Sequence, residues 1–517
     1  MLKQLSRVLR DFVRERSGNV AILFGFALIP MLLGLGLAVD YGRAMLVRDR
    51  MNDAADAAAL AIGSWPDLTQ AEQIAKAQQF FDANYSASTL GTVGKLSVSF
   101  VGDDITVGVS GTVKTTFMNV VNIDHMDVGA STTISRKQRN IELVLVLDTT
   151  GSMGSGGKLV AMQTAAKKMV STLFNGKATS TTLKIGVVPF SVAVNIGSDK
   201  LSSGWLDTAT YSTANLSTHP LAFEDLDKTN GVSALTLYGK VGKSWSGCVR
   251  ERGGAYELTD DPPSSGTPAS LWVPYFAPDE PDSASGTSYN NTYLSDGSYS
   301  NANCVKGAST SDQRQCNTGK YKSFSGTSSG PAYNCPPAKI TALTSTQSTV
   351  NTAIDSLVAN GNTVIPAGLL WGWRVLSPTL PFTEGAAYTD EKWVKAIVLL
   401  TDGENDVSQG ANGIDKSAYN AFGYAKNGHL GNASGSNANA TLDSKTLAVC
   451  NAIKQAGTVD KRIQLYTIGF QVTSASQTLL TSCATKPDMF YNSPSNEQLS
   501  GIFQDIAQGL GDLRIAK

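Results

Sequence analysis

The pattern of apolar and polar positions changes twice along the chain. Residues 19–39 form a continuous apolar run without a charged side chain. At about 1.5 Å per residue, a helix over this run would span roughly 30 Å, the thickness of a bilayer core.

The segment that follows the apolar run is expected to contain a helix at 70–85. Alternation typical of strands then appears in three segments: 95–101, 105–113 and 128–134. Residues 40–138 are therefore expected to form a small α+β stem.

From residue 140 onward, predicted strands alternate with predicted helices. The mainly apolar run 141–147 has the pattern of a fully buried central strand. Further strands are expected at 183–192, 394–401 and 463–470, and helices at 158–174, 345–359, 443–455 and from 496. This alternation predicts an α/β fold with a doubly wound, mostly parallel sheet over residues 139–517.

Two stretches interrupt this pattern. Between about 197 and 338 the periodicity gives way to Ser, Gly, Asn, Pro and Tyr, and a smaller excursion occupies 407–440. A structureless loop of the first length is uncommon inside a compact domain. The sequence therefore predicts an inserted subdomain, in which four of the six cysteines would form disulfides: Cys248, Cys304, Cys316 and Cys335.

Composition narrows the class of protein. In 517 residues, 42 basic side chains nearly balance 43 acidic ones, so the net charge of -1 offers no overall attraction to nucleic acid. The 3 histidines and the absence of a CxxC pair argue against a zinc site. An even number of cysteines, all beyond the apolar run, favours disulfides in an oxidising compartment over buried thiols in a cytosolic protein.

We expect Cys450 and Cys483 to pair, because they lie in helices that flank the predicted strand 463–470. The other four cysteines would pair within the insertion or at its base. Cys304 and Cys316 are close enough in sequence to close a short loop.

Charges around the apolar run predict its orientation. Before it, basic residues outnumber Asp11 and Glu15: Lys3, Arg7, Arg10, Arg14 and Arg16. By the positive-inside rule, residues 1–18 stay cytoplasmic, 19–39 cross the inner membrane once, and the rest is periplasmic. A cleaved signal peptide is the competing interpretation, but the run is long for one and no Ala-x-Ala-like site closely follows it.

The stretches RSGNVAILFGFALIP (16–30) and VDYGRAMLVRDRMNDAADAAALA (39–61) resemble the N-terminal segment of the TadE/TadG family of tight-adherence (Flp) pilus assembly. Pilin-like members carry Glu five residues after the processing Gly, whereas Leu23 stands at that distance from Gly18. The resemblance therefore favours the unprocessed, TadG-like branch. The alanines of 52–62 would continue the anchor helix, either to admit a partner helix or simply as good helix formers.

The main candidate site follows the predicted strand 141–147. Here Asp148, Thr150 and Ser152 present one carboxylate and two hydroxyls at alternate positions. Ligands of doubly wound sheets bind beyond the carboxyl ends of the strands, where this loop falls. Hard cations such as Mg²⁺ prefer oxygen ligands of this kind.

This loop resembles the metal-ion-dependent adhesion site of the von Willebrand factor A fold, whose pattern is Asp-x-Ser/Thr-x-Ser, then a distant Thr, then a distant Asp. Thr363, in GNTVIPAG, matches the second element, and Asp402, in IVLLTDG, matches the third. Each element falls at a predicted junction between strand and loop. The resemblance implies that Thr150, Ser152 and Thr363 supply hydroxyl oxygens to Mg²⁺, Mn²⁺ or Ca²⁺. Asp148 and Asp402 would hold the ion directly or through water, leaving one position for a partner's carboxylate.

Other chemistries find less support. The loop before Lys158 superficially resembles a phosphate-binding loop, but its glycine spacing is wrong and Leu159 replaces the required Ser or Thr. No Ser of the loop has the setting of a nucleophile elbow. His125, His219 and His429 lie in polar settings without an obvious acid partner. The acidic run 279–282 is expected to be a solvated turn rather than a Ca²⁺ site.

These observations together predict a binding protein and not an enzyme. It would be a membrane-anchored pilus-assembly or adhesion component that binds a protein partner, such as another pilus-assembly or surface protein, through the metal site. One alternative is a minor pilin-like subunit of the fibre. The other is a periplasmic hydrolase that uses the insertion as its catalytic part, for which the sequence shows no paired base and nucleophile.

Overall fold

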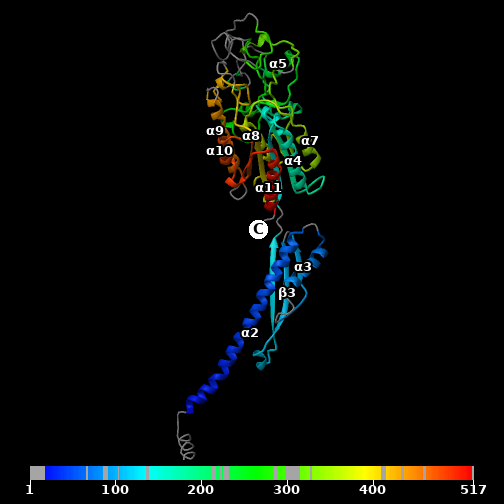
Figure 1. Cartoon of the computed structure of the whole chain (residues 1–517), viewed down its shortest axis with the longest axis vertical. Helices are drawn as coiled ribbons and strands as arrows, with labels where there is room; N and C mark the ends of the chain where they lie inside the picture. The colour runs from blue at the N-terminus through cyan, green and yellow to red at the C-terminus, as the bar shows by residue number, and fades with distance from the viewer. Residues whose placement is uncertain are drawn as a thin grey trace, which may run out of the picture. The chain divides into compact units, whose positions relative to one another are not determined.

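The computed structural model describes residues 18–65, 68–85, 91–102, 104–135, 139–210, 217–219, 221, 224, 232–282, 289–296, 315–326, 329–408, 415–431, 436–457 and 462–514. The chain divides into two compact units, with the boundary between Gln138 and Arg139. Figure 1 shows a long helix and a small sheet in the first unit, and a sheet flanked by helices in the second.

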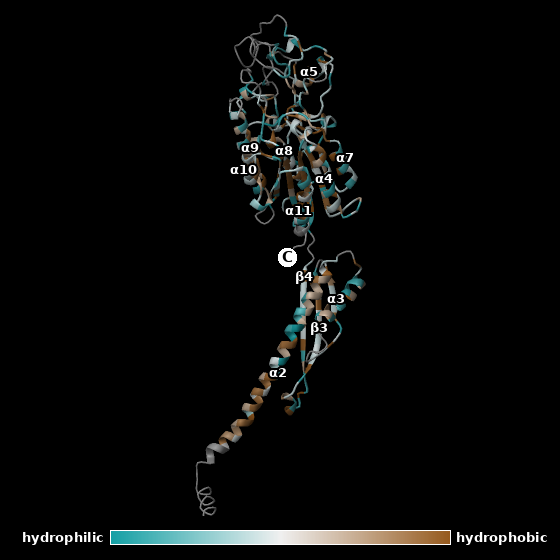
Figure 2. Ribbon diagram, viewed as in Figure 1, coloured by the Kyte–Doolittle hydropathy of each residue, from teal (hydrophilic) through white to brown (hydrophobic). Residues whose placement is uncertain are grey.

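The first unit begins with one long helix, α2 (Gly18–Gly63), in two environments. Its first part is apolar (Figure 2). The side chains there are exposed, Leu23 by 68% and Phe26 by 73%. Within the described chain, one helix, Leu23–Gly63, is long and apolar enough to cross a membrane. This helix supports the expected membrane anchor, whereas its orientation and the choice of the inner membrane remain predictions.

The second part of α2 is packed against the rest of the first unit. Ala54, Ala55, Ala58 and Ala59 are buried, and α2 contacts α3 (Gln70–Asn84) and the sheet. The alanines thus continue the helix as predicted, and their small side chains also allow close approach of neighbouring elements. The helix α3 begins with a capping box in which Thr69 and Glu72 satisfy each other's backbone N–H groups.

The four strands of the first unit form an antiparallel sheet organised by β3, which pairs with the other three. The three predicted strands are confirmed, and the short strand β1 was not predicted. The strands are β1 (Gly91–Val93), β2 (Ser97–Val101), β3 (Asp104–Lys114) and β4 (His125–Ser135). Their apolar side chains, including Ile105 and Val107, close a core with α2 and α3.

The second unit contains a mixed six-stranded sheet in the order β12-β11-β10-β5-β6-β9. Neighbouring strands are parallel except for β6 and β9. The four predicted strands are present, and β9 and β12 are additional edge strands. The bounds are β5 (Asn140–Asp148), β6 (Leu183–Phe190), β9 (Thr341–Thr344), β10 (Trp393–Thr401), β11 (Gln464–Phe470) and β12 (Phe490–Ser493).

Helices cover both faces of this sheet because successive side chains of a strand point to opposite faces (Figure 1). In β5, Leu143 and Leu145 face one helical layer, whereas Val144 and Val146 face the other. The first layer consists of α4 (Lys158–Phe174), α7 (Gln347–Asp355) and α11 (Asn496–Arg514). The second consists of α8 (Ile365–Leu376), α9 (Ser436–Gln455) and α10 (Ser474–Cys483).

The described part of the insertion continues the core of the second layer. Its buried aromatic residues, such as Trp272 and Tyr275, belong to the same apolar cluster as Val144 and α8. Trp272 lies 4.9 Å from Trp371 of α8, measured between ring centroids. The regular elements here are short: β7 (Val194–Asn195), α5 (Ala234–Lys240) and β8 (Cys248–Val249).

Disulfides join segments that are distant in sequence. The predicted bond between Cys450 and Cys483 is confirmed, and it joins α9 to α10. Cys248 pairs with Cys335, so one bond closes the base of the insertion. Cys316 is also disulfide-bonded, and Cys304 lies outside the described residues.

Helix α8 was not predicted from the sequence, and its surroundings explain why. Every residue of Ile365–Leu376 is buried, so the segment has no polar face to reveal a helical period. Its glycines bring it close to the sheet. A Cβ added at Gly372 would lie 2.5 Å from Cγ2 of Val146 in β5. The contact between α8 and β5 therefore requires glycine.

Replacing Gly372 with Ala should lower the free energy of unfolding by about 1–3 kcal/mol, because the added methyl overpacks the contact with Val146. Gly501→Ala is the matched control. Gly501 lies in α11 with nothing within 4 Å of an added Cβ, so this change should be neutral or stabilise by up to about 1 kcal/mol. Urea unfolding of the full chain in detergent measures both. Equal effects of the two substitutions would contradict the close packing of α8.

Candidate functional site

The candidate site lies at the carboxyl ends of β5 and β10, the two central strands of the second sheet. The chain leaves β5 toward β6 on one side, whereas β10 and β11 extend the sheet on the other side. The strand order therefore reverses between β5 and β10, which is where open α/β sheets form a ligand-binding crevice. Asp148 ends β5, and Asp402 directly follows β10.

Asp148 is completely buried and accepts two hydrogen bonds. The pairing of Leu147 with Leu400 sets the last residues of the two strands side by side. As a result, the Thr401 hydroxyl donates to Oδ2 of Asp148 at 2.7 Å. The backbone N–H of Thr150 donates to Oδ1 at 2.8 Å, which turns the chain sharply after the strand.

Asp402 is held by the loop that follows β5. The Ser152 hydroxyl donates to its Oδ1 at 2.6 Å, and the Lys158 ammonium donates to its Oδ2 at 2.8 Å. The Thr150 and Ser152 hydroxyl oxygens are 3.0 Å apart. Four of the five predicted residues thus form one hydrogen-bonded cluster, which Lys158 completes.

The loop reaches Asp402 because both of its ends are fixed. A short 3-10 helix, η2 (Gly151–Gly154), follows Thr150, and the side chain of Met153 is buried beneath it in the core. Gly156 and Gly157 then adopt positive φ values of 60° and 71°, which favour glycine. The helix α4 begins directly afterwards at Lys158, whose ammonium therefore lies beside the loop.

Thr363 reaches the same edge by a different route from the one predicted. It does not follow a strand but lies in the loop before α8, whose apolar sequence concealed the helix. Two backbone hydrogen bonds with Asp406, of 3.1 and 2.9 Å, fix its position, and Gly361 accepts a bond from the N–H of Gly151 at 2.8 Å. A Cβ added at Gly403 would lie 4.0 Å from the Thr363 hydroxyl oxygen.

The two carboxylates make the site electrostatically unfavourable by itself. Burial and repulsion from Asp402 together raise the pKa of Asp148 from 3.8 to about 6, against the hydrogen bonds from Thr401 and Thr150, which lower it. Among the described residues, no group of three or more His, Cys, Asp or Glu side chains could hold a metal. Any ion here would depend on hydroxyl oxygens together with these two acids.

Two members of the cluster, Lys158 and Thr401, were not predicted as site residues. Lys158 was considered only as part of a phosphate-binding loop, although its place at the end of the glycine-rich loop indicates the same sheet edge. Thr401 precedes Asp402, so aligning the ends of the two central strands would have placed its hydroxyl beside Asp148.

The histidines were wrongly described as lacking acid partners. His125 lies 2.6 Å from Asp124, a direct neighbour. His219 lies 2.8 Å from Asp207, and His429 lies 3.0 Å from Glu224. These last two pairs line a cavity of about 260 Å³ with apolar walls that include Leu271 and Val273. In each pair the imidazole contacts a carboxylate oxygen.

The acidic run 279–282 is not the solvated turn that was expected. Asp279 and Glu280 are buried. Asp279 accepts bonds from the backbone N–H groups of Tyr293 and Leu294 and pairs with Lys320 at 2.7 Å. Asp279 thus holds this part of the insertion around a buried ammonium, and Glu280 accepts bonds from the backbone N–H groups of Asn290 and Asn291, so the role of both acids is structural.

Comparisons with known proteins relate the first unit to pilus assembly. The model of the TadE/G-like Flp pilus-assembly family matches residues 18–63, which confirms the resemblance of the N-terminal segment. No curated protein matches the sequence significantly.

Several solved structures share weak similarity with the chain. The pilus adhesin SpaC from Lactobacillus rhamnosus GG is 12% identical with a TM-score of 0.33, over 82% of this chain and 35% of SpaC. The vWF domain of the type V pili tip protein Mfa5 from Porphyromonas gingivalis is 9% identical with a TM-score of 0.33, over 74% and 97%. The PilB minor pilin from Streptococcus sanguinis is 14% identical with a TM-score of 0.31, over 81% and 77%. The chain thus spans about a third of SpaC, and TM-scores this low do not establish a shared fold.

The raised pKa of Asp148 predicts a dependence of stability on pH. Between about pH 4 and pH 6 the unfolded chain has lost this proton while the folded chain retains it, so the stabilisation present below pH 3.8 is lost as the pH rises through about 6. Asp148→Asn removes this titration. In chelator, the free energy of unfolding of the wild type relative to Asp148→Asn should fall by about 1–3 kcal/mol between about pH 4 and pH 7.

Urea unfolding at a series of pH values measures this difference. Asp488→Asn, at an exposed position after α10, is the control and should follow the wild type throughout. Parallel profiles for the wild type and Asp148→Asn would show that burial of Asp148 does not set its pKa.

Proposed function

We propose that the second unit is a von Willebrand factor A-type domain that binds a divalent cation, Mg²⁺ or else Mn²⁺ or Ca²⁺, and docks a carboxylate of a protein partner. The observation that carries the proposal is the cluster at the ends of β5 and β10. It joins two buried carboxylates and the three hydroxyls of Thr150, Ser152 and Thr401, from segments far apart in sequence. The reversal of strand order at this point supports a ligand site rather than a structural contact.

The residues present fit such an ion. All the donors are oxygens, which hard cations prefer, and two of them are carboxylates whose mutual repulsion a cation would relieve. Ser152 and Thr363 would supply hydroxyl oxygens, with Thr150 beside them, while Asp148 and Asp402 would supply the negative charge. When bound, the ion would supply a Lewis-acidic position that attracts an anionic group of a partner.

The protein's own residues would prepare this position. Thr401 and the Thr150 N–H fix both oxygens of Asp148, so the carboxylate cannot turn away. Ser152 is exposed at the loop, which leaves its oxygen accessible from solvent. Thr363 approaches from the loop before α8, so the site joins three segments of the chain. Its chemistry would be binding, without turnover of a substrate.

Lys158 would compete with the ion for Asp402. Its ammonium pairs with Oδ2 at 2.8 Å, and the carboxylate is completely buried. A positive charge at this distance from the site repels a divalent cation and neutralises part of the charge that would attract it. Lys158 would thus stabilise the ion-free site and would have to release Asp402 when an ion binds.

The match of residues 18–63 to a pilus-assembly family supports a setting for this binding. The chain would act as a membrane-anchored, TadG-like component whose partner is another pilus-assembly or surface protein. The domain would lie outside the cytoplasm, as the charges before the anchor and the disulfides suggest.

Calorimetric titration of the full chain with Mg²⁺ tests the site. Ser152→Ala removes a hydroxyl of the cluster and should weaken binding roughly 10- to 100-fold. The matched control is Ser155→Ala in the same loop, because the Ser155 hydroxyl bonds to the Ser152 backbone and should not affect binding. Lys158→Met should tighten binding about tenfold, a change of about 1.4 kcal/mol. Lys167→Met, which breaks an exposed pair on the same helix, should change nothing.

Capture of partners from a cell-envelope extract extends the test to function. Partners held by the wild type and by Ser155→Ala should be lost in chelator, and Ser152→Ala should lose them without chelator. If Ser152→Ala binds Mg²⁺ and its partners like the wild type, the ion-dependent mechanism is wrong.

A further inference from the structure

The loop between β3 and β4 in the first unit exposes an unusual amount of apolar surface. This tip, residues 115–123, has the sequence TTFMNVVNI and contains no charged side chain. It includes a short 3-10 helix, η1 (Met118–Val121). Its apolar side chains are exposed, with exposed fractions of 46% for Phe117, 78% for Val120, 51% for Val121 and 42% for Ile123. Clustered exposed apolar residues of this kind mark a binding surface.

Asp40 of α2 fixes the position of the tip. Its carboxylate accepts hydrogen bonds from the backbone N–H groups of Thr116, Phe117 and Met118, at distances of 2.8 to 3.1 Å. Arg43, one turn later, donates to the Thr116 hydroxyl at 2.6 Å. The carboxylate is 1% exposed, so the tip provides the hydrogen bonds that water would otherwise supply.

A glycine one turn earlier lets the tip lie directly against the helix. Gly36 is buried, and a Cβ added there would overlap Cβ of Phe117. Gly34, on the same stretch of helix, would have nothing within 4 Å of an added Cβ. The contact between the tip and α2 is therefore local and specific to Gly36.

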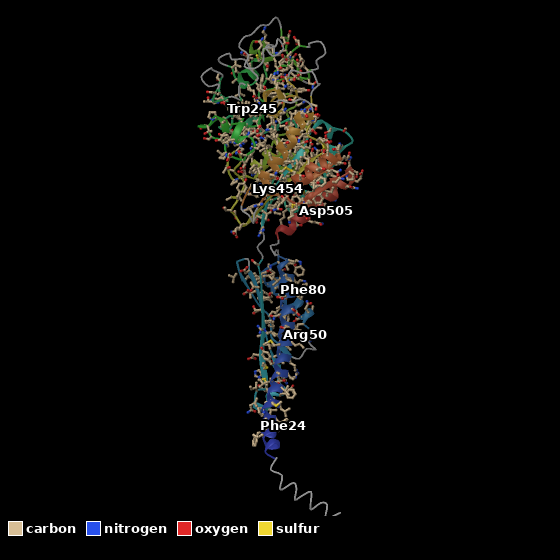
Figure 3. The ribbon with its side chains drawn as sticks, turned by 90° about the vertical axis from the view of Figure 1, so that its left-hand side faces the viewer. Phe24, Arg50, Phe80, Trp245, Lys454 and Asp505 are labelled. Carbon is tan, nitrogen blue, oxygen red and sulfur yellow. A yellow bond between two sulfur atoms is a disulfide. The ribbon has the colours of Figure 1, made fainter. Side chains whose placement is uncertain are left out.

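The depth of this contact follows from the apolar run of α2. Residues 19–39 carry no charge, and Asp40 is the first charged residue after them. Gly36 lies four residues before Asp40, about 6 Å deeper along the helix. In Figure 3, Phe24 marks the open apolar part of α2, and Arg50 lies farther along the same helix. If residues 19–39 are in a bilayer, Phe117 must lie beside Gly36, deeper in the membrane than Asp40, where the helix becomes polar.

We infer that the β3–β4 tip is a second membrane-contact element, which inserts Phe117, Val120, Val121 and Ile123 into the lipid interface beside α2. The absence of charge within the tip suits this location, and Lys114 and Asp124 bound it on the polar side. Two attachment points in place of one would restrict the tilt and rotation of the first unit at the membrane surface. This inference depends on the membrane anchor and not on the proposed metal site.

Two equally exposed valines at opposite ends of β3 provide the test. Val120 is 78% exposed in the tip, and Val101 is 75% exposed near the turn between β2 and β3. Each is replaced by Cys in the full chain, labelled with a fluorescent nitrobenzoxadiazole group and reconstituted into phosphatidylcholine vesicles. Lipids with a spin label near the head group should quench the label at position 120 several-fold more strongly than the label at position 101.

Gly36→Leu should move the tip away from α2 and reduce this quenching at position 120 by at least about half, whereas Gly34→Leu should leave it unchanged. Equal and weak quenching at both valine positions would show that the tip lies in water. A label at position 120 that is shielded from aqueous iodide but not quenched by lipid would show that a protein covers the tip. Either result would overturn the inference.

Discussion

The parallel pairing of β5 with β10 brings Asp148 and Asp402 together, and the rest of the candidate site depends on it. The register places Leu147 beside Leu400. The residues that follow, Asp148 in one strand and Thr401 and Asp402 in the other, therefore leave the sheet side by side. Two carboxylates then lie in a buried region, and burial and repulsion raise the pKa of Asp148 to about 6. The hydroxyls of Thr401 and Ser152 and the ammonium of Lys158 counter this cost by bonding to the acids. The same arrangement gives the site its affinity for a cation in the proposed function.

A similar use of buried carboxylates recurs in both units. Asp40 fixes the β3–β4 tip on α2, and Asp279 organises the insertion around Lys320. In each case the carboxylate accepts bonds from backbone N–H groups, which compensates the loss of water. At the candidate site two acids also share one region, and Lys158 is the cation that contacts Asp402 there in the described structure.

Sequence patterns identified the parts of the structure that have a local signal. The strand ending at Asp148 and the one preceding Asp402 are long and apolar, so their ends could be located. Helix α8 could not, because burial of all its residues removes the helical period, and for the same reason Thr363 was assigned to a strand end. The acid partners of His219 and His429 lie 12 and 205 residues away, and such pairings depend on the fold of the loops. The expectation of a doubly wound von Willebrand factor A fold rests on the strand order and remains part of the proposal.

Binding of Mn²⁺ to the full chain, followed by electron paramagnetic resonance, tests the central claim most directly. Free Mn²⁺ gives a six-line spectrum that is lost when the ion enters an asymmetric protein site. The account predicts that the wild type removes about one Mn²⁺ per chain from this signal. Asp402→Asn, which retains the shape of the side chain without its charge, should leave the ion free. Equal binding by the wild type and Asp402→Asn, or no binding by either, would contradict a cation site at the ends of β5 and β10.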